Sequence, residues 1–218
     1  MRITLHIGAP KTGSTALQRF LTGNIAQLAQ AGRSYPDVNL RGFGHHDLAF
    51  LLHGSYPDWA TPQPRTLDDL LGDLRLAIDT CPRELILSSE DFYIFPATNE
   101  LMHFLRAAGM RNEDDVRIVA YLRRQDEAHM SWYNQAVKAQ GYTRSIYEAL
   151  QDFHELWNYH AQLAPWISVF GKDAIEVRIL ENGDIRRDFL EIVGVPQNGF
   201  DFSAQKPNER LNRDLLEY

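Results

Sequence analysis

The sequence predicts an α/β fold with three layers, in which helices cover both faces of a central, mainly parallel sheet. Short apolar segments alternate along the chain with segments of helical periodicity, as in βαβ units. Two of the short segments, 85–87 and 118–120, are apolar without alternation, which is typical of strands that are buried on both faces. No internal repeat interrupts the pattern, so we expect one domain spanning 1–218.

Four strands and six helical regions account for most of the chain. The expected strands are 3–7, 84–88, 116–122 and 174–179. Apolar side chains spaced three and four residues apart predict helices, which are expected over 17–28, 67–78, 101–108 and 185–193. Thr66 is a suitable N-cap for the second of these helices, and Gly109 a suitable C-terminal residue for the third. Further helical regions are expected over 126–140 and 147–166, the last with a break near Pro165.

Two segments resist this assignment. The segment 31–65 is rich in Gly, Pro and His, and we expect it to form an irregular lid that carries Tyr56 and Trp59. The segment 200–213 is polar, and the helical pattern after it is cut off at Tyr218, which predicts that the chain is truncated at this end.

The composition excludes several classes of protein. Hydrophobic residues make up 44% of the chain and charged residues 23%, which excludes an intrinsically disordered protein. A net charge of −7 argues against nucleic acid as a partner, since neutralising phosphates requires an excess of Lys and Arg. The one cysteine, Cys81, cannot form an internal disulfide. No apolar stretch approaches the ~20 residues of a membrane span, and the first strand begins too early to leave room for a signal peptide. We therefore expect a cytoplasmic protein.

A glycine-containing loop connects the first strand to the first helix. Its sequence is Gly8-Ala9-Pro10-Lys11-Thr12-Gly13-Ser14-Thr15. A strand, such a loop and a helix N-terminus together direct backbone N–H groups and the helix dipole toward an anion. The glycine spacing equals that of a Walker A loop, but Lys11 lies inside the loop and Ser14 stands where a Walker A loop has its lysine. We interpret the loop as a phosphate site; the alternative is a glycine turn followed by an ordinary helix cap.

An arginine at a strand end and a serine in the next helix form a second candidate anion site. Arg123 follows the strand 116–122, and Ser131 lies eight residues later. A guanidinium group and a nearby hydroxyl can clamp a phosphate. The alternative is a surface arginine that forms an ion pair with Asp126 or Glu127. An arginine also stands where a nucleotide-hydrolysing enzyme has its magnesium-binding aspartate, so we expect anion binding without a metal ion.

These two motifs resemble those of the sulfotransferases that use 3′-phosphoadenosine-5′-phosphosulfate (PAPS). The loop is similar to their 5′-phosphosulfate-binding loop, and Arg123 with Ser131 matches their 3′-phosphate motif. The resemblance is closest to bacterial sulfotransferase-domain proteins, and it implies a fold related to the P-loop NTPases. It also implies that PAPS is the co-substrate and that no metal is required. The reaction would be in-line transfer of the sulfuryl group to an acceptor hydroxyl, with a carbohydrate or glycolipid as first choice and a small alcohol or phenol as second.

The resemblance further implies roles for individual residues. Lys11 would stabilise charge on the departing bisphosphate. The residues expected to cradle the 5′-phosphosulfate are Thr12, Gly13, Ser14 and Thr15. Arg123 and Ser131 would bind the 3′-phosphate, and Arg210 or Lys206, in a late basic segment, would close over the 3′-phosphate and the adenine.

An acceptor hydroxyl also needs a general base. Glu90, which follows the strand 84–88, is the first candidate, and His46, in the expected lid, is the second. Two other functions remain open. A P-loop kinase would use ATP and Mg²⁺, and a non-catalytic module would bind the nucleotide without turnover.

Overall fold

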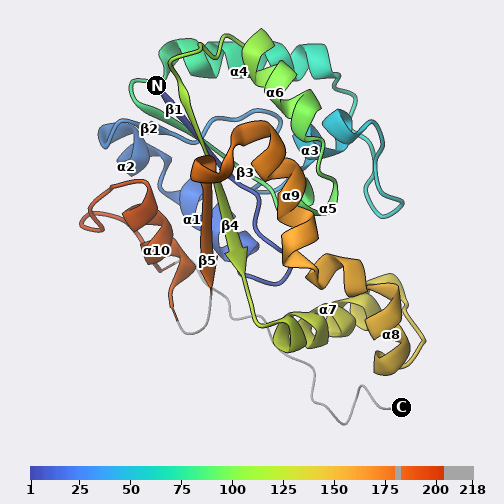
Figure 1. The fold of residues 1–218 in the computed structure, drawn as a ribbon. Helices are drawn as coiled ribbons and strands as arrows, with labels where there is room; N and C mark the ends of the chain where they lie inside the picture. Colours follow the sequence, from blue (N-terminus) through green and yellow to red (C-terminus); the bar gives the residue numbers. More distant parts are fainter. Residues whose placement is uncertain (180–182, 204–218) are drawn as a thin grey trace.

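The computed structural model describes residues 1–179 and 183–203 (Figure 1). Its sheet has five parallel strands in the order β2-β3-β1-β4-β5. The strands are β1 (Arg2–His6), β2 (Arg33–Ser34), β3 (Glu84–Ser88), β4 (Asp115–Leu122) and β5 (Ile175–Ile179). The α/β class and the parallel sheet are confirmed. Because β1 lies between β3 and β4, the segments that follow these three strands meet at one edge of the sheet.

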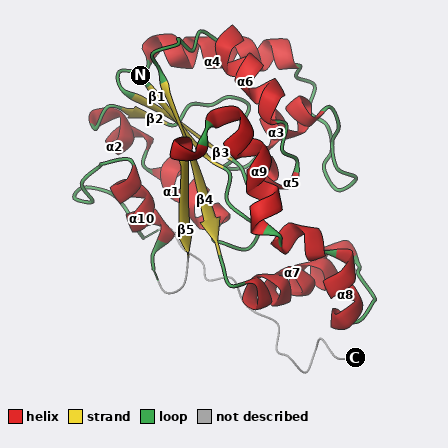
Figure 2. Cartoon of the chain, in the orientation of Figure 1, coloured by secondary structure: helices red, strands yellow, loops and turns green. Residues whose placement is uncertain are grey.

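Helices occupy both faces of the sheet, as the cartoon in Figure 2 shows. The α-helices are α1 (Ser14–Gly23), α2 (Ile25–Gln30), α3 (His46–His53), α4 (Leu67–Thr80), α5 (Asp91–Ile94), α6 (Thr98–Ala107), α7 (Gln125–Gln140), α8 (Ile146–Asp152), α9 (Tyr159–Phe170) and α10 (Ile185–Ile192). Two short 3₁₀ turns are η1 (His154–Trp157) and η2 (Lys172–Ala174). Among the described residues, no helix is both long and apolar enough to cross a membrane.

Two hydrophobic clusters fill the spaces between the sheet and its helices. One cluster joins alternate residues of β1, β3 and β4 to α3, α4, α6 and α9. The other joins the opposite face of β3 and β4 to α1, α2 and α10. In Figure 1 the helices of the first cluster lie on one side of the strands and those of the second on the other, which is the expected three-layer arrangement. Helices α7 and α8 extend beyond the carboxyl end of β4.

The expectation that 31–65 is irregular is wrong for two parts of this segment. It contains the short edge strand β2 and the helix α3. Leu48 and Phe50 of α3 are fully buried, so this helix contributes to the core. The sequence conceals α3 because the helix has only eight residues and begins with a histidine rather than with a capping residue.

Two helix boundaries also differ from the prediction. The apolar stripe over 17–28 is divided into α1 and α2 at Asn24, whose side chain donates to Phe20 O at 2.9 Å. The region 147–166 breaks at Phe153 and Asn158, whereas Pro165 lies inside α9. Asn158 accepts a hydrogen bond from the Ala161 N–H, which starts a new helix. Proline removes one backbone donor, and the packed helix tolerates that loss.

The structure confirms the two helix-end residues that the sequence predicts. Thr66 and Asp69 form a capping box at the start of α4. Gly109 follows α6 with a φ of 108°, a conformation that favours glycine. The predicted C-terminal helix, its truncation at the end of the chain, Lys206 and Arg210 lie outside the described residues.

Candidate functional site

The loop 8–15 turns at the carboxyl edge of the sheet, directly above β1. Ile7 N donates to Val119 O at 2.9 Å and Ala9 N to Tyr121 O at 3.0 Å, so the loop stays attached to β4 before it turns. Lys11 has a φ of 67°, which is uncommon for a residue with a side chain. Thr12 Oγ1 donates to Ala9 O at 2.6 Å and closes the loop on itself. Thr12 is therefore occupied by the loop's own backbone.

The N-terminus of α1 is not neutralised by the protein. Gly13 is its N-cap, no side chain caps it, and its first turn contains no acidic residue. The Ser14 hydroxyl is buried and has no hydrogen-bond partner among the described residues. Buried polar atoms are nearly always paired, and this hydroxyl lies at a helix N-terminus, where an anion can bind. An anion would satisfy both the hydroxyl and the helix dipole.

Lys11 connects the loop to α7, which brings the two predicted motifs together. Its Nζ donates to Gln135 Oε1 at 2.8 Å, and Gln135 lies one helical turn beyond Ser131. Burial lowers the pKa of the Lys11 amine. The charge of Glu90 opposes this shift, while Lys138 and Arg123 lower the pKa further. A cluster of cations beside a helix N-terminus is suited to a multiply charged anion.

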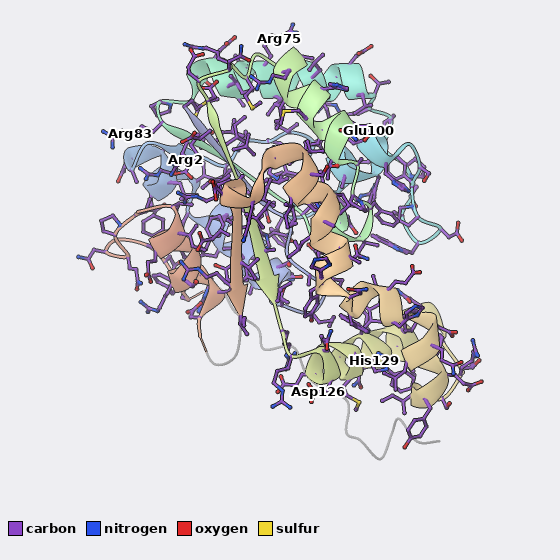
Figure 3. The ribbon with its side chains drawn as sticks, viewed as in Figure 1. Arg2, Arg75, Arg83, Glu100, Asp126 and His129 are labelled. Carbon is purple, nitrogen blue, oxygen red and sulfur yellow. The ribbon has the colours of Figure 1, made fainter. Side chains whose placement is uncertain are left out.

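Arg123 is currently held by a carboxylate. Its Nε and one terminal nitrogen both lie 2.8 Å from Glu127 Oε2, as the surface alternative predicts. The Glu127 side chain is 47% exposed and that of Arg123 only 20% exposed, so the arginine is the more buried partner of this pair. Tyr159 fixes the backbone here by donating to Arg123 O at 2.6 Å. Asp126, labelled in Figure 3 at the start of α7, pairs with Arg124 instead.

The two candidate bases come from two elements: Glu90 follows β3, and His46 is the first residue of α3. Glu90 is the N-cap residue of α5, and its Oε2 accepts a hydrogen bond from Gln18 Nε2 at 2.8 Å. Gln18 belongs to α1 and is itself buried. The Glu90 charge raises the pKa values of both Lys11 and His46. Glu90 therefore stands close to both of the other residues predicted to be catalytic.

His46 is oriented by two buried groups. Its Nδ1 lies 2.6 Å from Asp91 Oδ2 and 2.9 Å from Ser89 Oγ, and Ser89 Oγ accepts from Asp91 N at 3.1 Å. A carboxylate accepts only, so Nδ1 carries the proton and Nε2 of the neutral ring is left as the acceptor. A Cβ on Gly44 would stand 2.6 Å from His46 Nε2. Only glycine leaves that space open.

The protonation of His46 depends on its acidic neighbours. Burial lowers its pKa, but the Asp91 hydrogen bond and the charges of Glu90, Asp91 and Asp47 outweigh burial, so the pKa of His46 lies above its usual range. The adjacent His45 differs. Its Nε2 lies 2.9 Å from Pro36 O, its Nδ1 accepts from Ser88 N at 3.0 Å, and burial lowers its pKa to about 4. His45 is a structural residue.

The residues that contact and orient the predicted site residues were not identified from the sequence. Gln18, Gln135, Ser89 and Asp91 were not predicted. A glutamine on the buried stripe of α1 is a detectable signal, since glutamine is seldom buried without a partner. Asp91 follows Glu90 directly, but its contact with His46 depends on the fold. Among the described residues, no group of three or more His, Cys, Asp or Glu side chains could hold a metal ion.

A hollow of about 440 Å³ lies at the opposite, amino edge of the sheet. Its lining residues are Met1, Arg2, Arg33, Pro82, Arg83, Glu84, Glu113 and Asp115. Figure 3 shows Arg2 and Arg83 far from Asp126 and His129 of α7. The residues that line the hollow carry charges of both signs, and several of them pair with one another. The hollow therefore does not favour a ligand of one charge.

Comparison with known proteins supports the fold. No family model matches the sequence. An uncharacterized protein from Archaeoglobus fulgidus is 33% identical over 116 residues, which are 51% of this chain and 30% of that protein. The matched region thus spans less than a third of the relative's length. The crystal structure of a sulfotransferase from Alicyclobacillus acidocaldarius matches 97% of this chain and 87% of its own, with a TM-score of 0.58 and 20% identity. At that identity the likeness shows a shared fold.

Proposed function

We propose that this protein is a PAPS-dependent sulfotransferase. The observation that carries the proposal is the hydrogen bond from Lys11 to Gln135 on α7. It holds the helix that bears Ser131 against the loop 8–15, which supports the proposal that one nucleotide contacts both anion sites. The fold shared with a sulfotransferase supports the same conclusion.

The described residues fit the two charged ends of such a donor. The unpaired Ser14 hydroxyl and the uncapped α1 N-terminus would hold the 5′-phosphosulfate, together with the N–H groups of Gly13 and Thr15. Arg123, released from Glu127, and Ser131 would hold the 3′-phosphate. The bound PAPS supplies the sulfuryl group that is transferred.

Lys11 would act on the leaving side of the reaction. Its ammonium group is partly desolvated, which strengthens its interaction with negative charge. A donor that is already aimed at the oxygen where charge develops stabilises the transition state more than the bound substrate. The acceptor proton would leave on the opposite side of the loop.

His46 would accept that proton, and Glu90 is the second candidate. The orientation by Asp91 favours His46, because an oriented histidine with a free Nε2 has the arrangement of a general base. Glu90 would assist by raising the basicity of His46. The acceptor would be a carbohydrate or glycolipid hydroxyl, with a small alcohol or phenol as second choice. The exposed Trp59 ring beside α3 suits a sugar face.

Calorimetric titration tests the donor assignment. We expect 3′,5′-bisphosphoadenosine to bind without Mg²⁺ and more tightly than 5′-AMP, because only the bisphosphate reaches Arg123. Arg123→Ala should lower its affinity at least tenfold, which is typical for a charge-assisted contact. Arg124→Ala is the matched control, since Arg124 pairs with Asp126 and should change little.

Three outcomes would contradict the proposal. Equal affinity for 5′-AMP would leave Arg123 and Ser131 without a 3′-phosphate role. Binding of ATP that requires Mg²⁺ would indicate a P-loop kinase. Tight binding of the bisphosphate without sulfuryl transfer to any sugar or phenol would indicate a non-catalytic module.

A further inference from the structure

His6, the last residue of β1, lies under the loop 8–15 and is fully buried. Its ring packs edge-on against Tyr121 and Phe189, with centroids 5.7 and 6.2 Å away. Its Nδ1 lies 2.8 Å from Ser88 Oγ. Its Nε2 has no hydrogen-bond partner in the part of the chain that the structure describes. A buried nitrogen without a hydrogen-bond partner destabilises the folded chain, so its presence calls for an explanation.

The position of His6 Nε2 close to Gly8 and Ser14 offers an explanation. A Cβ built on Gly8 would stand 2.6 Å from His6 Nε2 and 2.9 Å from Ser14 Oγ. The two atoms therefore flank one point beneath the loop, and both are unpaired within residues 1–179 and 183–203. The absence of a side chain on Gly8 keeps the space between them open. Both atoms are thus directed toward the same space beside Gly8.

The imidazole of His6 is neutral, because burial lowers its pKa to about 3. A neutral ring has one N–H group and one lone pair. If the Ser88 hydroxyl donates to Nδ1, then Nε2 carries the proton and presents it to the loop. The Ser14 oxygen can accept that proton while its own hydroxyl hydrogen points to an anion.

We propose that His6 is a positioning residue for the anion in the loop: its Nε2–H group donates to Ser14 Oγ and turns the Ser14 hydroxyl toward the 5′ end of the donor. The inference rests on the proposed function for the identity of that anion. The hydrogen bonds then run in one direction from Ser88 through His6 and Ser14 to the ligand. Each hydroxyl or N–H group in this series donates one hydrogen bond. His6 Nε2 and Ser14 Oγ therefore both have partners when the ligand is bound.

Titration of variants tests the role. His6→Leu removes both ring nitrogens, and His6→Gln retains an amide N–H at a similar reach. We expect His6→Leu to bind 3′,5′-bisphosphoadenosine about tenfold more weakly, a typical effect of one hydrogen bond. Its affinity for adenosine 3′-monophosphate should not change, because that ligand has no 5′-phosphate. His6→Gln should recover part of the loss.

Two controls separate positioning from stability. Thr4→Val changes another fully buried polar residue of β1, whose Oγ1 donates to Glu84 Oε1 at 2.5 Å, at the amino end of β3. It should lower Tm without changing the ratio of the two affinities. His6→Leu added to Ser14→Ala should cost no further affinity, since His6 acts through Ser14. Additive losses, or equal losses for both nucleotides, would overturn the inference.

The tautomer gives a test that does not depend on the ligand or on a variant. In the ¹⁵N NMR spectrum of the parent protein, His6 Nε2 should carry the proton across the neutral pH range. A proton on Nδ1 instead would refute the proposed direction of the hydrogen bonds. The two proposals can fail separately. If the parent protein binds inorganic pyrophosphate but not 3′,5′-bisphosphoadenosine, the proposed function fails. If His6→Leu then weakens pyrophosphate binding, the role of His6 still stands. If the parent binds neither ligand, both proposals fail.

Discussion

At the amino ends of its strands the sheet carries charged side chains that form ion pairs with one another, whereas buried polar atoms of His6 and Ser14 at the carboxyl ends have no partner among the described residues. Glu84 illustrates the first case. It accepts from Thr4 and forms an ion pair with Arg33 at 3.3 Å, which joins β1, β2 and β3. Ser14 and His6 illustrate the second case, since neither Ser14 Oγ nor His6 Nε2 is bonded within the described residues.

This difference separates stability from function along a single sheet. Paired groups at the amino edge stabilise the folded chain and leave little for a ligand to recognise. Unpaired groups at the carboxyl edge cost stability in the free protein, which is common at functional sites. Substitutions at the two edges should therefore change different measured quantities.

The largest effect is expected at the amino edge. Arg33→Met leaves the Glu84 carboxylate buried without its counter-ion and should lower the free energy of unfolding by about 3 kcal/mol. Urea denaturation measures this change. The double variant Arg33→Met with Glu84→Gln should recover part of the loss, because it removes the unpaired charge. Loss of bisphosphate affinity at unchanged stability would contradict the comparison.

The next effect is expected at Lys11. Lys11→Met keeps the length of the side chain and removes the charge, so turnover should fall about 100-fold, as when one stabilising donor is lost from a transition state. Tm should stay the same or rise, because a desolvated cation near Arg123 and Lys138 is removed. Lys172→Met in η2 is the control and should change neither quantity. A large fall in Tm would assign Lys11 to the fold instead.

The smallest effect is a displacement of the pH profile. His46 has a raised pKa, so the rate should increase with pH as His46 loses its proton above pH 6.5. Asp91→Asn removes the main group that raises this pKa, and the midpoint should move to lower pH. The stability that the His46–Asp91 pair adds is complete below ~6.5, the unfolded pKa, and is lost as pH rises through the folded value. A midpoint unmoved by Asp91→Asn, with activity abolished by Glu90→Gln, would make Glu90 the base.

Local sequence patterns predicted most of the fold. Strands β1, β3, β4 and β5 were placed within one residue, because each has an apolar run long enough to stand out. Strand β2 has two residues and no pattern of its own, and it forms because it pairs with Glu84 and Leu85. Helix α3 is defined by burial against α4, α5 and α6, which a local pattern does not contain.

The candidate site likewise has one part that a local sequence pattern predicts and another that depends on long-range contacts. The loop 8–15 is contiguous, so its chemistry is visible in the sequence. The contacts of Gln18 with Glu90 and of Lys11 with Gln135 span 72 and 124 residues, and only the folded chain brings these partners together. The roles assigned to Lys11, Glu90, His46, Arg123 and Ser131 remain predictions, as does that of Arg210.

The central position of β1 has a consequence for how such a protein can diversify. Glu90 and His46 approach the loop from the β3 side, while Arg123 and Ser131 approach it from the β4 side. If the proposed function is correct, the two substrates are recognised by elements on opposite sides of the central strand β1. Mutations around α3 and α5 could then redirect the enzyme to new acceptors while α7 continues to hold the same nucleotide.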